Sequence, residues 1–289
     1  MAKVYFTKEI SEDSLVKMFD VLGVELSGKV CVKLHSGEEG NQNYLRPEMV
    51  KKLVERVNGV VVECNTAYEG SRDTTEKHTK LMEKHGWTKY FDVDIMDGEV
   101  EDKVLSIPNG KVIKKNYVGG HIDNYDSMLV LSHFKGHPMG GYGGSLKQLS
   151  IGIASGYGKR YIHCVGKDNG TYEDMFSVEQ DKFLEAMADA ASSIIPEFKQ
   201  IVYINVMCNM SVDCDCCSVA KDPCMKDIGV LASLDPVAID QACIDLVYKS
   251  LDDGKKHLIE RIESRNGLHT IECAESLGIG SREYELVEI

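Results

Sequence analysis

The chain has 289 residues, of which 43% are hydrophobic and 27% are charged, and its formal net charge at pH 7 is −13. This composition is typical of a globular protein with enough apolar residues for a sizeable core. The acidic balance argues against sequence-independent binding to nucleic acid, which needs a basic surface, and against docking on an anionic membrane.

The N-terminal residues lack the apolar segment of a secretory signal, and no run of about 18 apolar residues occurs. We therefore expect a protein of the reducing cytoplasm that does not enter a membrane. In that compartment the ten cysteines should be free thiols or metal ligands rather than disulfides.

The N-terminal third alternates strand-like and helix-like segments. Apolar, strand-like patterns fall at 3–7, 29–36, 60–66 and 91–96. Helical patterns lie between them, at 11–23, 47–59 and 73–87. Ser11 is a suitable N-cap for the first helix, and Pro47 suits the first turn of the second. The alternation predicts an α/β fold with a mostly parallel sheet covered by helices.

The rest of the chain continues this pattern after a less regular segment at 98–127. Strands are predicted at 127–134, 200–211, 228–233 and 284–289. Helices are predicted at 177–195, 235–250, 255–264 and 269–277, with Asp235 as the N-cap of the second. Because no repeat or linker is visible, we expect one α/β domain over 1–289, either compact or in two lobes of about 1–126 and 127–289.

A cysteine-rich stretch, "NMSVDCDCCSVAKDPC", follows the strand predicted at 200–211. Cys214, Cys216, Cys217 and Cys224 have the spacing C-x-C-C-x6-C, and Cys208 precedes them. Thiolates bind soft metals, so these four are candidate ligands of an iron–sulfur cluster, 4Fe-4S in the first instance, or of zinc. Redox-active thiols and simple packing are the alternatives. The remaining cysteines are expected to be packing residues: Cys31, Cys64, Cys164, Cys243 and Cys273.

A glycine-rich stretch, "SHFKGHPMGGYGGSLKQLSIG", follows the strand predicted at 127–134. His133 and His137 are candidate proton carriers because imidazole titrates near neutrality. Gly140, Gly141, Gly143 and Gly144 precede a helix start at Ser145, where backbone amides could bind an anionic cofactor or substrate. Lys147 could contact the same anion. The alternative is a tight structural turn.

Polar loops also follow two other predicted strands. The segment 33–47 offers Lys33 and His35, and the segment 65–75 offers Tyr68 and Arg72. If the sheet is parallel, all these loops lie at its carboxyl edge, where α/β proteins bind their ligands. Their convergence predicts one site for a small anionic substrate.

The blocks "KLHSGE", "HFKGHPMGGYGGSLKQLSIG", "CDC" and "DIGVLASLDPVAIDQA" together resemble the DUF362 family, a group described as iron–sulfur-centre proteins. The resemblance implies a metal-dependent redox role in anaerobic metabolism. It also implies the following functional positions: Lys33, His133, Lys147, Cys214, Cys216, Asp227 and Asp240. Many longer members carry a ferredoxin-like insertion. Here only Cys164 lies between Gly158 and Ser177, so an external ferredoxin-type electron donor is the expected partner.

A weaker likeness links "HPMGGYGGSLKQLSIGIA" to the LarA lactate racemase group, which uses a nickel-containing nucleotide cofactor. The matching positions are His133, His137 and Lys147. This likeness makes nickel an alternative to iron and zinc.

Three functions therefore remain open. The first is an iron–sulfur or other metal-dependent oxidoreductase that acts on a small anionic substrate or cofactor. The second is a LarA-like isomerase or lyase with a nucleotide-derived cofactor, which would need the histidines and Lys147 but not the cysteines. The third is a non-catalytic metal-binding or cluster-carrier protein.

Overall fold

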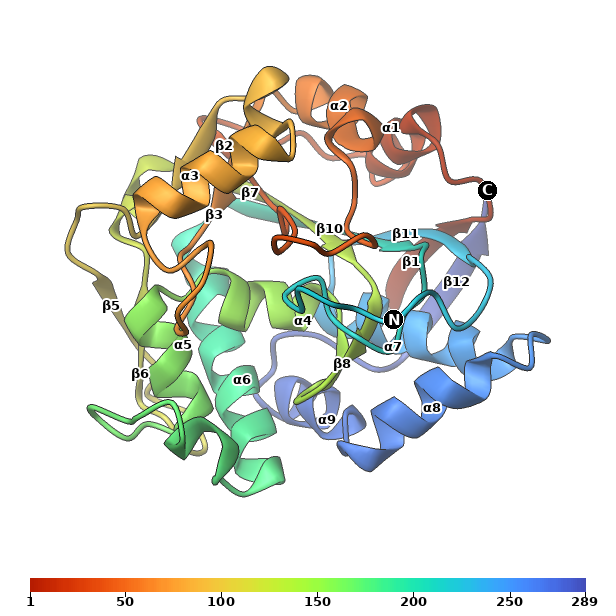
Figure 1. Ribbon diagram of the computed structural model, residues 1–289. Coiled ribbons are helices and arrows are strands. Elements are labelled where there is room, and N and C mark those ends of the chain that lie inside the picture. The colour runs from red at the N-terminus through yellow and green to blue at the C-terminus, as the bar shows by residue number, and fades with distance from the viewer.

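An eight-stranded sheet runs through the computed structural model, which describes residues 1–289 (Figure 1). Its strand order is β12-β1-β11-β10-β7-β2-β3-β4. The strands are β1 (Ala2–Thr7), β2 (Val30–Lys33), β3 (Gly59–Glu63), β4 (Val93–Ile95), β7 (Ser127–His133), β10 (Gln200–Met207), β11 (Gly229–Ser233) and β12 (Tyr284–Glu288). All neighbours are parallel except β11, which is antiparallel to β1 and β10. The predicted α/β fold with a mostly parallel sheet is confirmed.

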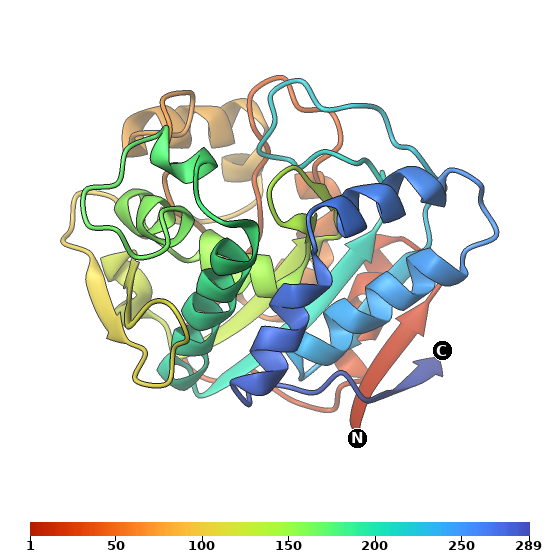
Figure 2. The same cartoon turned by 90° about the horizontal axis from the view of Figure 1, so that it is seen from below.

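Helices cover both faces of the sheet (Figures 1 and 2). One face carries α1 (Glu12–Asp20), α2 (Pro47–Arg56) and α3 (Thr75–Lys84). The other carries α4 (Ser145–Lys147), α5 (Gly156–His163), α6 (Gln180–Ile194), α7 (Pro236–Lys249), α8 (Lys255–Ser264) and α9 (Leu268–Ser276). The sheet is therefore the middle layer of three.

The core divides into two halves because alternate strand residues point to opposite faces of the sheet. In β7, Met128 and Val130 pack in the core that contains α6 and α7. Leu129 and Leu131 pack in the core that contains α1 and α2. All four side chains are fully buried. Burial on both faces explains why this strand reads as a continuous apolar run rather than an alternating one.

Three segments differ from the simple alternation predicted from the sequence. The irregular segment 98–127 contains a two-stranded antiparallel sheet of β5 (Lys103–Ser106) and β6 (Lys115–Val118). The glycine-rich segment folds into a second one, of β8 (Lys135–His137) and β9 (Gly141–Gly143). A π-helical turn at Gln148–Gly152 follows α4. Such turns are frequent at functional sites.

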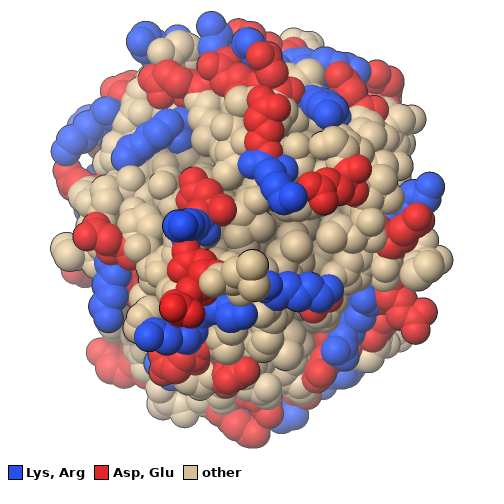
Figure 3. Space-filling view, turned by 90° about the vertical axis from the view of Figure 1, so that its right-hand side faces the viewer, with Lys and Arg blue, Asp and Glu red and all other residues tan.

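The outer surface carries acidic and basic side chains intermixed on the face drawn in Figure 3, without a basic stripe. None of the helices has both the length and the apolar character that crossing a lipid bilayer requires.

The cap of α7 gives a first test of the local structure. Asp235 accepts hydrogen bonds from the amides of Val237, Ala238 and Ser281, each at 2.9 Å. Asp235→Ala should lower the free energy of unfolding by about 1–2 kcal/mol, because buried amides lose their acceptor. Urea denaturation followed by circular dichroism measures the loss. Asp222→Ala, at an exposed position, is the control and should change stability by less than about 0.5 kcal/mol. Equal losses in both variants would contradict the capping role.

Candidate metal centre and cavity

The carboxyl ends of β2, β3, β7 and β10 lie at one edge of the sheet because these strands are parallel. The antiparallel strand β11 begins at that same edge. The connection 208–228, here called the cysteine loop, therefore leaves and re-enters the sheet at one edge. The topology brings its cysteines next to the polar loops that follow β2, β3 and β7.

A buried ion pair joins the ends of β2 and β3. The Nζ of Lys33 lies 2.6 Å from Oε2 of Glu63 and 3.2 Å from Oε1 of Gln148. The other carboxylate oxygen of Glu63 accepts a hydrogen bond from the amide of Ser36 at 2.9 Å. Burial acts to raise the pKa of Glu63, but the charges around it, of which that of Lys33 is the strongest, together outweigh burial and hold that pKa well below its ordinary value. The carboxylate of Glu63 therefore stays ionised inside the protein.

A second buried charge network joins the cysteine loop to the end of β7. The carboxylate of Asp215 lies 2.9 Å from Nδ1 of His133 and 2.8 Å from Nζ of Lys135. Burial acts to raise the pKa of Asp215, but these two cationic partners hold it below its ordinary value. Because Asp215 stands between Cys214 and Cys216, this network fixes the chain on which both cysteines lie.

His133 is enclosed by hydrogen-bond acceptors. Its Nε2 lies 2.6 Å from the carbonyl oxygen of Cys208, and its Nδ1 faces Asp215. Both ring nitrogens therefore face oxygen atoms of the protein itself, and neither is free for a ligand. The side chain is buried and does not line the cavity described below. The geometry gives His133 a positioning role for the cysteine loop.

Cys214 and Cys216 lie together with His137, and their ligand atoms are within 4.8 Å of one another. This group could hold a metal ion. Cys214 is fully buried, and the Nζ of Lys147 lies 3.7 Å from its Sγ. A hydrogen bond with Cys216, followed by the charges of Lys147 and Lys135, holds the pKa of Cys214 well below its ordinary value. These contacts favour the thiolate form of Cys214.

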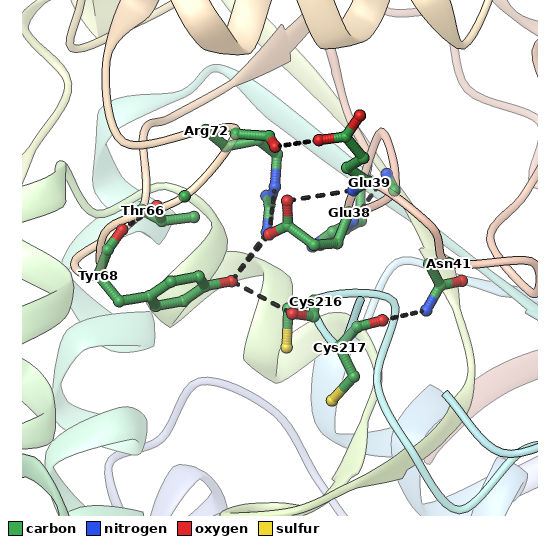
Figure 4. A network of polar contacts seen from close by, with 12 residues as sticks. Glu38, Glu39, Asn41, Thr66, Tyr68, Arg72, Cys216 and Cys217 are labelled. Carbon is green, nitrogen blue, oxygen red and sulfur yellow. Dashed lines mark hydrogen bonds and ion pairs between the residues drawn. The ribbon is translucent and has the colours of Figure 1, made fainter. Parts of the chain in front are cut away.

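Cys217 extends this group on the far side of Cys216. A hydrogen bond with Cys216 is the main cause that lowers the pKa of Cys217. Cys216 and Cys217 both line the cavity, and Figure 4 shows both sulfurs pointing away from the polar network beside them. Cys216 thus interacts with both Cys214 and Cys217, in a short row of cysteines.

The other cysteines of the stretch lie apart from this row. The thiol of Cys224 donates to the carbonyl of Met210 at 3.1 Å. Cys208 is buried, and burial raises the pKa of its thiol to about 12. All ten cysteines are free. Of the four cysteines predicted to be ligands, the structure brings together the first three and not Cys224.

His137 is set up as a hydrogen-bond donor. Its Nδ1 accepts hydrogen bonds from the amides of Met139 at 3.2 Å and Gly140 at 2.8 Å. Burial lowers the pKa of His137 to about 4, so the ring is neutral and carries its proton on Nε2. A metal-bound histidine normally donates its second N–H to an acceptor, which is the opposite arrangement. His137 is therefore better suited to donate to the sulfur of Cys214 than to bind the metal itself.

A cavity of 460 Å³ opens beside the cysteines. Four cationic side chains line it: Lys33, Arg72, Lys147 and Lys159. Lys147 lies against the Cys214 sulfur, and Lys159 donates only to backbone carbonyls, so neither has a carboxylate partner. Burial lowers the pKa of Lys159. The cavity has surplus positive charge and suits an anion.

Arg72 belongs to a network that supports the cysteine loop (Figure 4). Its Nη2 lies 2.9 Å from the Glu38 carboxylate. The hydroxyl of Tyr68 lies within hydrogen-bond distance of two acceptors, the carboxylate of Glu38 at 3.2 Å and the carbonyl oxygen of Cys216 at 3.3 Å. The segments 33–47 and 65–75 therefore meet against the cysteine loop.

The glycines of the glycine-rich hairpin do not line the cavity, although His137, Pro138 and Met139 of the same hairpin do. None of its predicted cofactor-binding residues lines it: Gly140, Gly141, Gly143, Gly144 and Ser145. The amides of Ser145 and Leu146 instead donate to the carboxylate of Asp240 at 2.8 and 3.0 Å. A Cβ at position 144 would lie 2.5 Å from that carboxylate, so glycine permits the close approach. The start of α4 is thus occupied by an anion of the protein itself.

Four residues of the site were not among the candidates from the sequence: Glu63, Lys159, His163 and Asp215. Glu63 ends an apolar strand, and Asp215 separates two cysteines. A charged residue at the end of a buried strand, or between two candidate ligands, could have marked both residues as part of the site. Lys159 and His163 lie one turn apart on α5, and nothing in their local sequence distinguishes them from surface residues.

The fold and the site define an α/β protein with a cysteine group beside a cationic cavity. A family model described as "Domain of unknown function (DUF362)" matches residues 30–245. The chain belongs to the DUF362 family, as its sequence blocks indicate. No curated protein matches the chain.

Two solved structures show low similarity to this chain. The lactate racemase apoprotein from Thermoanaerobacterium thermosaccharolyticum is 17% identical, with a TM-score of 0.40, and the match covers 70% of this chain and 50% of that one. A protein from Thermotoga maritima is 10% identical, with a TM-score of 0.42, and the match covers 92% of this chain and 58% of that one. The chain thus spans between half and three fifths of these two proteins, and similarity this low supports no functional comparison.

The Lys33–Glu63 pair predicts a pH-dependent stability. Glu63→Gln should destabilise the protein near neutral pH by roughly 3–5 kcal/mol, because it leaves a buried ammonium without its carboxylate. The pKa of Glu63 is lowered on folding, so its contribution is complete above the unfolded value of about 4.3 and is lost as the pH falls below it.

Urea unfolding at neutral pH and at about pH 3.5 checks this, since the difference between wild type and Glu63→Gln should shrink at the lower pH. Glu55→Gln, whose side chain is 57% exposed, is the control. A difference that does not change with pH would contradict the ionised pair.

Proposed function

We propose that the protein is a metal-dependent oxidoreductase in which Cys214, Cys216 and Cys217 hold a metal centre beside a site for a small anionic substrate. The main support is that the sulfurs of Cys214 and Cys216 lie within 4.8 Å of each other, while Cys216 and Cys217 line the cavity. Thiolates bind soft metals, and an iron–sulfur cluster of the 4Fe-4S type is our first choice. Zinc and nickel are the alternatives that metal analysis distinguishes.

The donor set fits a centre with one open position. Three cysteine sulfurs are available, whereas Cys224 is bonded to a backbone carbonyl elsewhere. Three protein ligands and one open position are typical of catalytic rather than structural metal sites. Lys147 and His137 place positive charge and an N–H group near the Cys214 sulfur, and such groups tune reduction potential. When bound, the centre would supply electron transfer.

Lys147 and Lys159 would hold the anionic group of the substrate. Neither has a carboxylate partner, and only the sulfur of Cys214 lies beside Lys147, so an incoming carboxylate or phosphate would add compensating charge. A cavity of 460 Å³ suits a small molecule. The substrate would therefore lie between these ammonium groups and the half-buried residues Cys216 and Cys217, which line the cavity.

Two neutral imidazoles would supply protons. His35 and His137 both line the cavity, and burial holds the pKa of each below its ordinary value. The Nδ1 of His35 accepts a hydrogen bond from the amide of Gly37 at 3.0 Å, so Nε2 carries its proton. The N–H of His35 is thus free for a ligand, whereas that of His137 faces the sulfur of Cys214. His133 is less suited because both of its nitrogens are bonded to protein acceptors.

The proposed reaction needs an electron donor outside this chain. Only Cys164 lies between Gly158 and Ser177, where longer members of the family carry a ferredoxin-like insertion. A ferredoxin-type protein of the reducing cytoplasm is the class of partner we propose.

Protein prepared without oxygen should contain iron and sulfide and absorb near roughly 400 nm. The double variant Cys214→Ser/Cys216→Ser should lose most of the iron and this absorption, because it removes two of three thiolates. Analysis for iron, sulfide, zinc and nickel identifies the metal. Cys224→Ser is the matched control and should keep the metal, since its thiol lies apart from the group.

A preparation free of iron, zinc and nickel would contradict the proposed centre. Equal metal content in the double variant and in Cys224→Ser would contradict the assigned ligands. An activity that survives the double substitution would instead favour a LarA-like isomerase or lyase, which does not use these cysteines. Bound metal with no effect of Lys147 substitution on anion binding would favour a cluster carrier.

Lys147→Met and Lys159→Met should each weaken anion binding by about ten-fold, the effect of losing one charged hydrogen bond. Isothermal titration calorimetry with oxalate and with inorganic phosphate as probes measures the change. Lys199→Met is the control, because Lys199 is exposed and paired with Asp126. The same affinity in all three variants would contradict an anion site in the cavity.

A further inference from the structure

A second group of metal-binding side chains lies between α6 and α9. Glu185 of α6 and His269 and Cys273 of α9 place their ligand atoms within 4.8 Å of one another. None of the three lines the cavity. We propose that they form a second metal site, for zinc or a similar divalent transition ion. Cys273 would then be a ligand rather than the packing residue expected from the sequence.

The spacing of the three ligand atoms fits zinc. The Nε2 of His269 lies 3.5 Å from Sγ of Cys273 and 3.5 Å from Oε1 of Glu185. A tetrahedral zinc ion with bonds of about 2.0–2.3 Å separates neighbouring ligand atoms by roughly 3.3–3.7 Å. His269 and Cys273 are four residues apart on one helix, so the helix itself holds two of the ligands on one face. Little movement is needed to bind an ion.

The orientation of His269 favours a metal site over a catalytic triad. Its Nε2 faces both the thiol and the Glu185 carboxylate, while its Nδ1 lies 3.6 Å from the carboxylate of Glu272. A metal-bound histidine presents one nitrogen to the ion and donates the other N–H to an acceptor such as a carboxylate. A triad would need the thiol and the orienting carboxylate of Glu185 on opposite nitrogens.

Two lysines now contact the ligand atoms. The Nζ of Lys111 lies 3.6 Å from Sγ of Cys273, and that of Lys182 lies 2.8 Å from Glu185. Both lysines are exposed, so they can turn into solvent when a metal ion neutralises the ligands. The side chain of His269 is 23% exposed, which gives an ion a route to the buried sulfur.

An ion at this position would join α9 to α6. Near the start of α6, Gln180 donates to the carbonyls of Met139 and Arg265, both at 2.8 Å. The same helix therefore supports the turn that follows His137 and the turn before α9. A metal ion at the second site would therefore stabilise α6, which holds the turn after His137, although the two sites share no ligand.

Cobalt(II) is the probe that tests this site, because it replaces zinc and reports thiolate ligation by its absorption. The protein is stripped with a chelator and carries Cys214→Ser, Cys216→Ser and Cys217→Ser, so the first centre cannot contribute. We expect one equivalent of cobalt, with a sulfur-to-cobalt charge-transfer band and the visible bands of tetrahedral coordination. His269→Ala or Cys273→Ser should abolish these bands. Glu272→Gln should weaken binding about ten-fold.

Cys164→Ser in the same background is the matched control and should keep the bands, since Cys164 belongs to neither group. If the triple variant does not fold, the titration is done on stripped wild type against His269→Ala. The difference spectrum between the two then isolates the second site. Absence of the bands, or their persistence without His269 or Cys273, would overturn the inference. Neither result bears on the centre at Cys214.

Discussion

The arrangement of the site depends on one buried carboxylate, that of Asp215. The cysteine loop has no regular secondary structure to fix its path. A carboxylate inside a protein is stable only beside compensating charge. His133 and Lys135 supply that charge from the end of β7 and from β8, so the loop is held at one point against the sheet. Cys214 and Cys216 flank Asp215, so their positions are fixed by the strands that carry His133 and Lys135 as well as by the loop itself.

The pairing of charges decides what the cavity can bind. Lys33 and Arg72 are each neutralised by a buried carboxylate and serve mainly to join loops. Lys147 and Lys159 have no such partner, and they remain available to a ligand. A protein with a net charge of −13 thus keeps an enclosed positive region, which attracts small anions while the outer surface repels large ones.

The helix caps and the buried strands could be predicted from the sequence because the interactions that determine them are local. The Ser11 and Asp235 caps, Pro47 at the start of α2 and the apolar run of β7 all act within a few residues, and the structure has each of them. The role of the glycines at 140–144 could not be predicted, because the carboxylate that takes up the amides after them comes from Asp240, far along the chain. The separation of Cys224 from the other cysteines is likewise non-local.

The single antiparallel strand explains why the cysteines are at the ligand-binding edge. A parallel successor to β10 would need a crossover to the opposite edge, whereas β11 lets the chain return at once. A long loop without secondary structure is usually either functional or disordered. This loop is ordered by specific bonds: Asn41 donates to the carbonyls of Cys214 and Cys217, and Asn43 donates to that of Lys221. Because these bonds hold the backbone of the loop, they leave the sulfurs of Cys214, Cys216 and Cys217 free to bind a ligand.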